Sequence, residues 1–293
     1  MREVAFKQVD VFPQVAFGGN PVAVILDGSG LDGCAMQAIA RWTNLSETTF
    51  VLPATTPAAS YRVRIFTPRR ELPFAGHPSV GTAHAVLEAG LAEAVDGALV
   101  QECAAGLLPV RVEEDAPQRR ILVRAPAARL APLPEPDAGL LLAALGADAG
   151  AAVTARPAAV DVGPVWLVLQ LGDAARVRAL EPDLAALAAL SDATGAVGIT
   201  VFGAEPDDAP DRYAVRSFCP ADGIDEDPVC GSGNAAVGAW LHAAGAAGDG
   251  AWTSSQGREC GRDGRVAVRI DADDRVWIGG GATTRIEGRI ALG

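Results

Sequence analysis

Two segments of this chain repeat one another, and this repeat constrains the fold more than any other feature of the sequence. Residues 63–68 read VRIFTP and residues 215–220 read VRSFCP, with four of six positions identical at an offset of 152. Each segment alternates like a strand and ends at a proline. In both cases a polar loop, a glycine and a run of small residues typical of a helix follow, at residues 76–90 and 231–245. The repeated order of elements favours duplication over chance similarity in an alanine-rich chain.

A fainter repeat lies upstream, where GNPVAVIL (19–26) resembles GPVWLVLQL (163–171). Each is a proline-led apolar strand, and together with the first repeat they predict two matching halves of about 140 residues. The segment APAARLAPLPEPDAG (125–139) is rich in proline and alanine and lies near the midpoint. This composition predicts a linker.

The remaining patterns predict an α+β fold in which strands outnumber helices. A helix is predicted over residues 32–43, with Asp32 near its N-cap, and another over residues 183–190. Most strands are short and neighbouring, which favours antiparallel sheets around a few helices over a doubly wound parallel sheet. Further strands are predicted at 4–12, 48–52, 107–113, 120–124, 265–270 and 275–278.

The composition excludes several classes of partner. The formal charge is −12, which gives no electrostatic footprint for a nucleic-acid backbone. No run approaches the ~20 apolar residues of a membrane span, and the N-terminal residues MREVAFKQVDVF lack the apolar stretch of a signal peptide. We therefore expect a cytoplasmic protein that binds neither nucleic acid nor membrane.

Metal and cofactor chemistry is not indicated by the sequence. The five cysteines are dispersed without a C-x-x-C pair, and the three histidines are not spaced with them as a zinc site, so free thiols are expected. The chain has no G-x-S-x-G elbow, no P-loop and no dinucleotide fingerprint after a strand. Acid/base catalysis by side chains, without metal or cofactor, is the simplest chemistry that remains.

The two glycine-led helix starts are the first candidate site. A helix N-terminus offers unpaired N–H groups and a partial positive charge, so two of them facing each other would bind a carboxylate or an oxyanion. Alternatively, Gly76 and Gly231 only permit tight turns. The polar residues at these turns are His77, Asp227 and Ser232. A carboxylate such as Asp227 near a helix start is also commonly a cap or a dipole partner.

Glu47 and Cys230 are each open to two interpretations. Glu47 lies where the apolar strand of NLSETTFVL (44–52) begins, and it either faces solvent or is buried, in which case desolvation raises its pKa and suits it to proton transfer. Cys230 precedes Gly231, so it is either an activated thiol at a helix start or a small buried packing residue. Ala75 holds the matching place in the first half, which excludes a two-thiol mechanism there.

Four segments together resemble the signature blocks of the PhzF-like family, the phenazine-biosynthesis isomerases of the diaminopimelate-epimerase fold. They are GGNPVAVIL (18–26), NLSETTFVL (44–52), FTPRRELPFAGHPSVGTAHAVL (66–87) and DEDPVCGSGNAAVGAWL (225–241), in the family's order. The resemblance implies two pseudo-symmetric domains, each a curled, mostly antiparallel, barrel-like sheet around a central helix, with the active site in the cleft between them. It also implies a homodimer.

The family's C-terminal strand usually returns to the first domain, and RIEGRIAL (285–292) is the candidate here. The expected first domain is therefore residues 1–127 plus about 283–293. The expected second domain is residues 128–282.

The resemblance also implies roles for particular residues. In the phenazine enzyme a glutamate moves a proton between carbons of a dihydro-hydroxyanthranilate, and Glu47 matches that glutamate. His77 matches the histidine of the G-H-P block and Asp227 the aspartate of E-D-P-V, both as groups that tune or relay protons. Substrate binding is expected at Asn20, Ser46, Gly76, Gly231 and Ser232.

The expected function is thus a cofactor-independent isomerase that shifts a double bond or hydrogen on a small carboxylated or amino-acid-like substrate. Phenazine enzymes often have threonine before the glycine of the last block, where this chain has Cys230. That difference leaves an amino-acid or hydroxy-acid epimerase using Glu47 and Cys230 as one alternative, although packing is the favoured role of Cys230. A non-catalytic small-molecule binding protein is the other. The sequence does not name the substrate.

Overall fold

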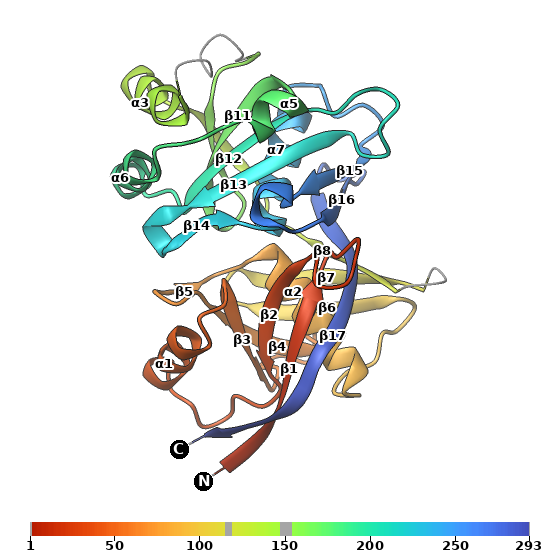
Figure 1. Ribbon diagram of the computed structural model, residues 1–293. Coiled ribbons are helices and arrows are strands. Elements are labelled where there is room, and N and C mark those ends of the chain that lie inside the picture. Colours follow the sequence, from red (N-terminus) through yellow and green to blue (C-terminus); the bar gives the residue numbers. More distant parts are fainter. Residues whose placement is uncertain (1, 115–118, 147–153, 293) are drawn as a thin grey trace. The chain divides into compact units, whose positions relative to one another are not determined.

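The computed structural model describes residues 2–114, 119–146 and 154–292. The chain divides into two compact units (Figure 1). Unit 1 is Met1–Arg124 with Gly279–Gly293, and unit 2 is Ala125–Ile278. Strands outnumber helices in the described parts of the chain and most strand pairs are antiparallel, so the predicted α+β class is confirmed.

Unit 1 is a barrel of strands. Its hydrogen-bonded order is β17–β1–β2–β3–β4–β6–β7–β8, and β8 pairs with β17 to close the ring. Two neighbouring pairs, β2–β3 and β4–β6, are parallel. The strands are β1 (Arg2–Val11), β2 (Asn20–Ile25), β3 (Glu47–Leu52), β4 (Tyr61–Phe66), β5 (Glu71–Leu72), β6 (Ala98–Cys103), β7 (Gly106–Glu113), β8 (Arg120–Arg124) and β17 (Val276–Leu292).

The helix α2 (Gly76–Glu88) fills this barrel. It contacts β1, β2, β3 and β8, and its residues from Gly76 to Ala83 are all buried. Small side chains make this possible, because a Cβ atom on Gly81 would lie only 2.4 Å from Cγ1 of Val22. The helix α1 (Gly33–Thr43) covers β3 and β4, and the Asp32 side chain accepts from the Ala35 N–H as its predicted N-cap.

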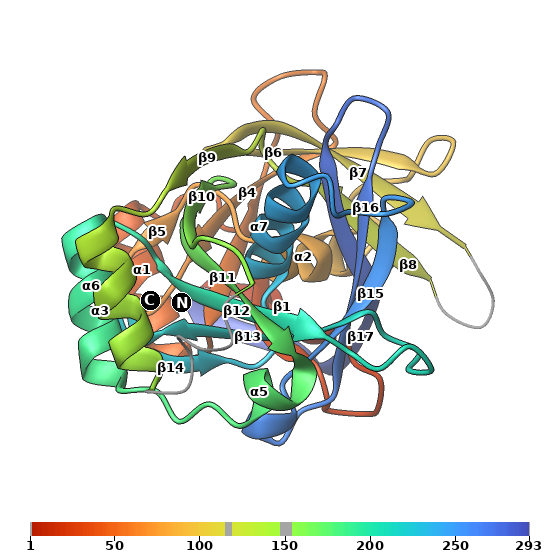
Figure 2. The same ribbon diagram turned by 90° about the horizontal axis from the view of Figure 1, so that it is seen from above.

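Unit 2 repeats this topology. Its order is β9–β10–β11–β12–β13–β15–β16, with β11–β12 and β13–β15 as the parallel pairs. The helix α7 (Gly231–Ala243) corresponds to α2 and contacts β10, β11, β12 and β16 (Figure 2). The strands are β9 (Arg129–Pro132), β10 (Ala158–Asp161), β11 (Val165–Asp173), β12 (Gly198–Ala204), β13 (Tyr213–Cys219), β14 (Ile224–Asp227), β15 (Ala251–Gln256) and β16 (Gly264–Ile270).

The same topology in both units supports the duplication read from the sequence. The repeated strands at 63–68 and 215–220 correspond to β4 and β13, and each has a parallel partner, β6 or β15. The remaining helices in the described part of unit 2 are α3 (Glu135–Leu145), α5 (Ala174–Arg178), α6 (Leu184–Thr194), η1 (Pro220–Asp222) and η2 (Arg258–Cys260).

The predicted linker at 125–139 is wrong, because this segment is part of unit 2. It contains β9, which pairs with β10, and the start of α3. Leu133 and Ala138 of this segment belong to the same buried cluster as Leu187 of α6, and α3 and α6 lie side by side (Figures 1 and 2). Burial of these residues outweighs the loop-like composition of the segment.

The two strands predicted at 275–278 and 285–292 form the single strand β17. The glycines between them read as a break, yet they extend the strand. A Cβ atom on Gly279 would lie 2.3 Å from the carbonyl oxygen of Ile121, so glycine is required here for the close approach of β17 to β8.

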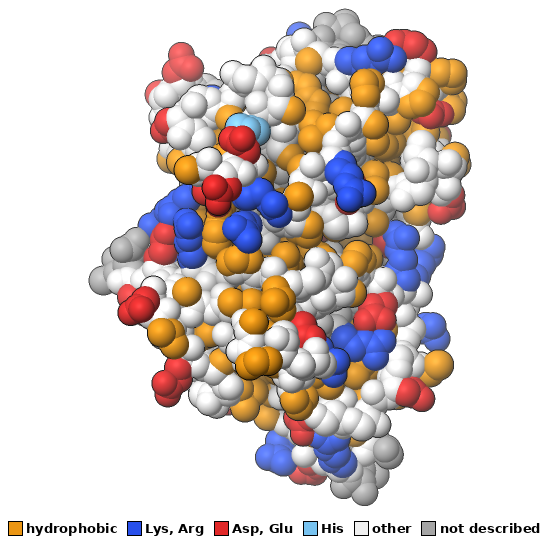
Figure 3. Space-filling model, turned by 180° about the vertical axis from the view of Figure 1, so that it is seen from behind, with side chains coloured by type: hydrophobic (Ala, Val, Ile, Leu, Met, Phe, Trp, Pro, Cys, Tyr) orange, Lys and Arg blue, Asp and Glu red, His pale blue; other side chains and the backbone are white. Residues whose placement is uncertain are grey.

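The surface mixes charges of both signs. Figure 3 shows acidic and basic side chains interspersed with apolar ones on the face that it displays. Within residues 2–114, 119–146 and 154–292, no helix has the length and apolar character needed to cross a membrane.

Candidate active site

Glu47 is buried and does not face solvent. It is the first residue of β3, is 7% exposed, and lies opposite Val22 of the parallel strand β2. Of the two alternatives left by the sequence, the structure therefore supports the buried carboxyl group. A buried carboxyl group in contact with a titratable partner is a candidate for proton transfer.

His77 provides that partner from the first turn of α2. Its Nε2 atom lies 3.3 Å from Oε2 of Glu47, and its Nδ1 atom lies 3.2 Å from Nδ2 of Asn20. Ser46 Oγ donates to Oδ1 of Asn20 at 3.0 Å. Ser46, Asn20, His77 and Glu47 thus form one line of polar contacts within unit 1.

The hydrogen bonds in this line assign the tautomer of His77. Nδ2 of Asn20 is a donor, so Nδ1 of His77 accepts and the ring proton resides on Nε2, facing Glu47. The 3.3 Å separation would also suit an ion pair. However, burial lowers the pKa of His77 to about 3, so the ring is neutral near pH 7. The contact is therefore between a neutral N–H and the glutamate carboxyl group.

A loop held by Asp10 delivers Asn20 to this line. Both Asp10 carboxylate oxygens accept main-chain hydrogen bonds, from Phe17 N at 2.8 Å and from Gly19 N at 2.9 Å. Phe12 and Phe17 adopt positive φ angles of 64° and 63°, a conformation that such residues rarely adopt. Sequence reasoning missed Asp10, because its role depends on this fold of residues 12–19 rather than on a motif.

Unit 2 places Asp227 and Cys230 at the two ends of the short loop that joins β14 to α7. Asp227 is buried and its Oδ1 accepts from the Val229 N–H at 3.1 Å. Burial raises the pKa of Asp227 to about 6, and Glu226 adds to the rise, while hydrogen bonds from Cys230 and Val229 oppose it. An Asp with this pKa changes protonation state close to neutral pH.

Cys230 is the N-cap of α7. Its Sγ atom accepts from the Gly233 N–H at 3.3 Å and lies 3.7 Å from Oγ of Ser232. This position satisfies a helix-start N–H group, which agrees with a packing and capping role. The position of the thiol at a helix start leaves the second-acid/base alternative open.

Ser232 is oriented by a tryptophan that the sequence did not single out. Nε1 of Trp166 on β11 donates to Oγ of Ser232 at 3.2 Å. Since this bond uses a lone pair of the hydroxyl group, the Ser232 proton can be donated elsewhere. Trp166 lies within the GPVWLVLQL segment that revealed the upstream repeat, but nothing in that pattern pointed to a site.

The predicted site residues therefore form two groups, one in each unit. Unit 1 brings together Asn20, Ser46, Glu47, Gly76 and His77, and unit 2 brings together Asp227, Cys230, Gly231 and Ser232. Among the described residues, no cluster of three His, Cys, Asp or Glu side chains is placed to bind a metal ion.

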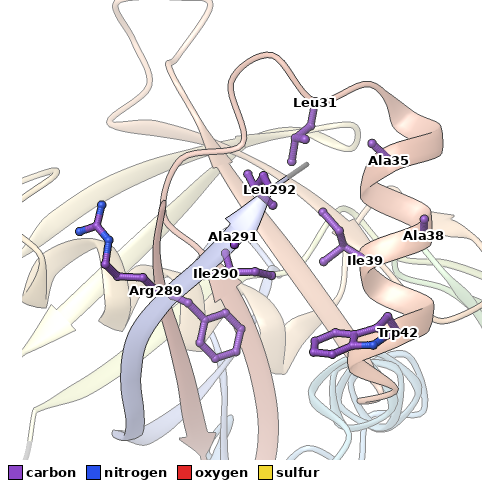
Figure 4. Close-up of a pocket in the computed structure, with 10 residues that line it drawn as sticks. Leu31, Ala35, Ala38, Ile39, Trp42, Arg289, Ile290, Ala291 and Leu292 are labelled. Atoms are coloured by element: carbon purple, nitrogen blue, oxygen red, sulfur yellow. The ribbon is translucent and has the colours of Figure 1, made fainter. Parts of the chain in front are cut away.

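A pocket of about 750 Å³ in unit 1 is lined mainly by apolar residues, unlike the polar groups described above (Figure 4). It lies between α1 and the end of β17, and its charged lining residue, Arg289, is 3.1 Å from Glu3 Oε2. The pocket includes none of the predicted site residues, so we do not take it as the catalytic centre. Its apolar lining includes Phe6, Leu31, Ile39, Trp42, Ile290 and Leu292.

A barrel enclosing a buried helix, with a buried carboxyl group beside a neutral imidazole, is a scaffold for acid/base chemistry on a bound ligand. The profile of the family described as "Phenazine biosynthesis-like protein" matches residues 9–288. The chain belongs to this family, which confirms the resemblance found in the sequence blocks.

Individual relatives agree with this assignment. The chain is 38% identical to antisense-enhancing sequence 1 of Schizosaccharomyces pombe, over 99% of each protein. It is 35% identical to an uncharacterized isomerase of Mesorhizobium japonicum, over 97% of each. Among solved structures, the Bacillus anthracis phenazine biosynthesis protein of the PhzF family superposes with a TM-score of 0.83 at 26% identity, with both chains covered completely.

Proposed function

We propose that this protein is an isomerase that moves a proton on a small carboxylated or amino-acid-like substrate, with Glu47 as the acid/base. The observation that carries this proposal is the buried Glu47 carboxyl group facing the Nε2–H of neutral His77 at 3.3 Å. Family membership and the relative named an isomerase support the reaction class.

The chemistry needs no more than these side chains. Glu47 as carboxylate takes a proton from a substrate carbon, so that a C–H bond breaks, an O–H bond forms and the electron pair moves into the adjacent unsaturated system. Glu47 then returns the proton to another carbon of the same system, which restores the carboxylate. The Nε2–H group of His77 stabilises the carboxylate between turnovers, and Asn20 and Ser46 hold the ring in that orientation.

The substrate carboxylate would be bound by helix-start N–H groups. The N-cap of α2 is Ala75, whose side chain makes no capping hydrogen bond, so Gly76 and His77 begin a helix without a side-chain cap. In unit 2, Gly231 begins α7 and Ser232 offers its hydroxyl proton. Asp227, with its raised pKa, would serve as a second proton donor or acceptor near neutral pH.

A substrate screen tests the proposal. Small amino and hydroxy acids are incubated with the wild-type protein in heavy water and followed by NMR. We expect deuterium to enter one compound at a carbon next to its unsaturated or carboxylated centre, with a hydrogen or double bond shifted in the product. If compounds that raise the melting temperature exchange no proton, the protein is a binding protein and the proposal is refuted.

An epimerase using Glu47 and Cys230 is the second candidate, favoured by the position of Cys230 Sγ at the start of α7. This reading predicts inversion at a single carbon and loss of activity in Cys230→Ala. Cys219→Ala, which changes another buried cysteine of unit 2, is the matched control. Full activity of Cys230→Ala would eliminate the epimerase reading and leave Cys230 as a cap.

A further inference from the structure

One buried side chain of unit 2 binds the main chain at both ends of the loop that carries Asp227 and Cys230. Gln256 is the last residue of β15 and is 2% exposed. Its Nε2 donates to the carbonyl oxygen of Asp227 at 2.9 Å, and its Oε1 accepts from the Cys230 N–H at 3.1 Å. A single amide group therefore pairs with two main-chain groups that lie three residues apart.

Asn234 of α7 completes the network and fixes the direction of each bond. Its Nδ2 donates to the carbonyl oxygen of Cys230 at 2.8 Å and to Oε1 of Gln256 at 2.9 Å. A carbonyl oxygen can only accept, so the Asn234 atom beside it is the nitrogen, and the Gln256 atom beside that nitrogen is the oxygen. This leaves Nε2 of Gln256 facing the Asp227 carbonyl oxygen, which again can only accept.

The main chain next to Gln256 also packs closely against this loop. Gly257 has a φ of 101°, and a Cβ atom there would lie 2.4 Å from the carbonyl oxygen of Pro228. A Cβ atom on Gly264, where β16 begins, would lie 2.3 Å from Cγ2 of Val229. The end of β15 and the start of β16 therefore support residues 228–229 closely, while Gln256 binds residues 227 and 230.

We propose that Gln256 is a positioning residue that sets the placement of Cys230 relative to Asp227. A buried amide is costly unless it is hydrogen-bonded, and here both of its polar atoms are used on this one loop. That Asp227 and Cys230 then act on a substrate rests on the proposed function. The proposal that Gln256 fixes the position of this loop does not depend on that function. Opening of the loop can be measured without any substrate.

The test follows alkylation of individual cysteines by iodoacetamide, with peptide mass spectrometry as the readout. Cys219 on β13 is also buried in unit 2 and reports global opening, whereas Cys230 reports opening of the loop. Gln256→Met keeps the side-chain length and removes both hydrogen-bonding atoms. We expect it to raise the alkylation rate of Cys230 about tenfold while that of Cys219 changes little, because the loop opens locally.

Two further variants keep the test decisive. Gln256→Glu retains an acceptor for the Cys230 N–H, so we expect the Cys230 rate to rise less than in Gln256→Met. Gln101→Met is the matched control, since Gln101 is a buried amide of unit 1 that bonds to Ser79 and Tyr61. It should leave the ratio of the Cys230 and Cys219 rates unchanged.

The proposal is overturned if both cysteines of Gln256→Met become reactive together, or if Gln101→Met changes the ratio equally. Either result would make Gln256 an ordinary contributor to stability. Since no substrate enters the measurement, failure of the isomerase proposal would leave this result unaffected, and failure here would leave Glu47 and His77 as proposed.

Discussion

The protonation state of His77 gives a prediction that can be worked out from the structure. The ring is buried against Glu47, its pKa falls from an ordinary value of about 6.5 to about 3, and Nδ1 accepts from Asn20. A lowered folded-state pKa means that the unfolded chain binds a proton before the folded protein does. The stability that neutral His77 contributes is therefore complete above about pH 6.5 and is lost as the pH falls towards 3.

The magnitude follows from linkage. Each pH unit between the two pKa values changes the free energy of unfolding by about 1.4 kcal/mol, so lowering the pH from 6.5 to 5 removes about 2 kcal/mol. His77→Gln lacks the titrating ring and escapes this loss. We expect the wild-type protein to lose its stability advantage over His77→Gln by about 2 kcal/mol across that interval, whatever the advantage is at pH 7.

Urea unfolding at pH 5, 6 and 7 is the assay, followed by circular dichroism. Tryptophan fluorescence is unsuitable here because Trp42 is the tryptophan of unit 1 and the other four of the chain's five lie in unit 2. If His77 were instead a charged partner of Glu47, its pKa would be raised and the wild-type advantage would grow as the pH falls. A constant or growing difference would refute the neutral tautomer.

Two other predictions concern stability. Asp227 has a folded-state pKa of about 6 against an ordinary value of about 3.9, so its contribution is complete below pH 3.9 and is lost as the pH rises to 6. Asp227→Asn should gain about 3 kcal/mol relative to wild type over this interval, measured by urea unfolding with tryptophan fluorescence, and a pH-independent difference would exclude the raised pKa. Gly81→Ala should lower the free energy of unfolding by about 1–3 kcal/mol, because its Cβ would lie 2.4 Å from Val22. Gly238→Ala in α7, whose Cβ would meet its nearest atoms at 3.0 Å, should cost less when both variants are unfolded in urea and followed by circular dichroism; equal losses would contradict the packing described for the two helices.

The regular elements of this fold were predictable where local pattern and local structure agree. Asp32 is a good N-cap wherever a helix follows it, and it caps α1. Gly90 and Gly245 adopt positive φ angles of 66° and 67° just past α2 and α7, as a C′ glycine does. These features depend on a few neighbouring residues, which the sequence displays directly.

Tertiary contacts decided the elements that were misjudged. Residues 125–139 have a loop-like composition, yet strand pairing with β10 and burial of Leu133 and Ala138 order them. Glycines at 279–281 look like a strand end, but the approach of β17 to Ile121 requires glycine at position 279. In both cases the residues that make the contact, in β10 and at Ile121, are distant in sequence, so a local sequence pattern could not reveal them.

The residues of the candidate site also divide into those that a local sequence pattern revealed and those that depend on tertiary contacts. His77 stood out from its place beside a glycine-led helix, and Glu47 from its place at the start of an apolar strand. Whether Glu47 is buried depends on the face of β3 that the barrel encloses, which the strand alone does not reveal. Trp166 and Gln256 gave no signal, since each acts through partners at least 22 positions away in sequence.

The role of Glu47 is tested most directly by deuterium wash-in from heavy water into the substrate that the screen identifies. Glu47→Gln keeps the size of the side chain and removes the titrating carboxyl group. Glu3→Gln, which changes an exposed glutamate of unit 1 paired with Arg289, is the control. We predict that Glu47→Gln folds normally and exchanges at least about 100-fold more slowly, whereas Glu3→Gln exchanges at the wild-type rate. Exchange in Glu47→Gln at the wild-type rate would contradict the assignment of Glu47 as the acid/base.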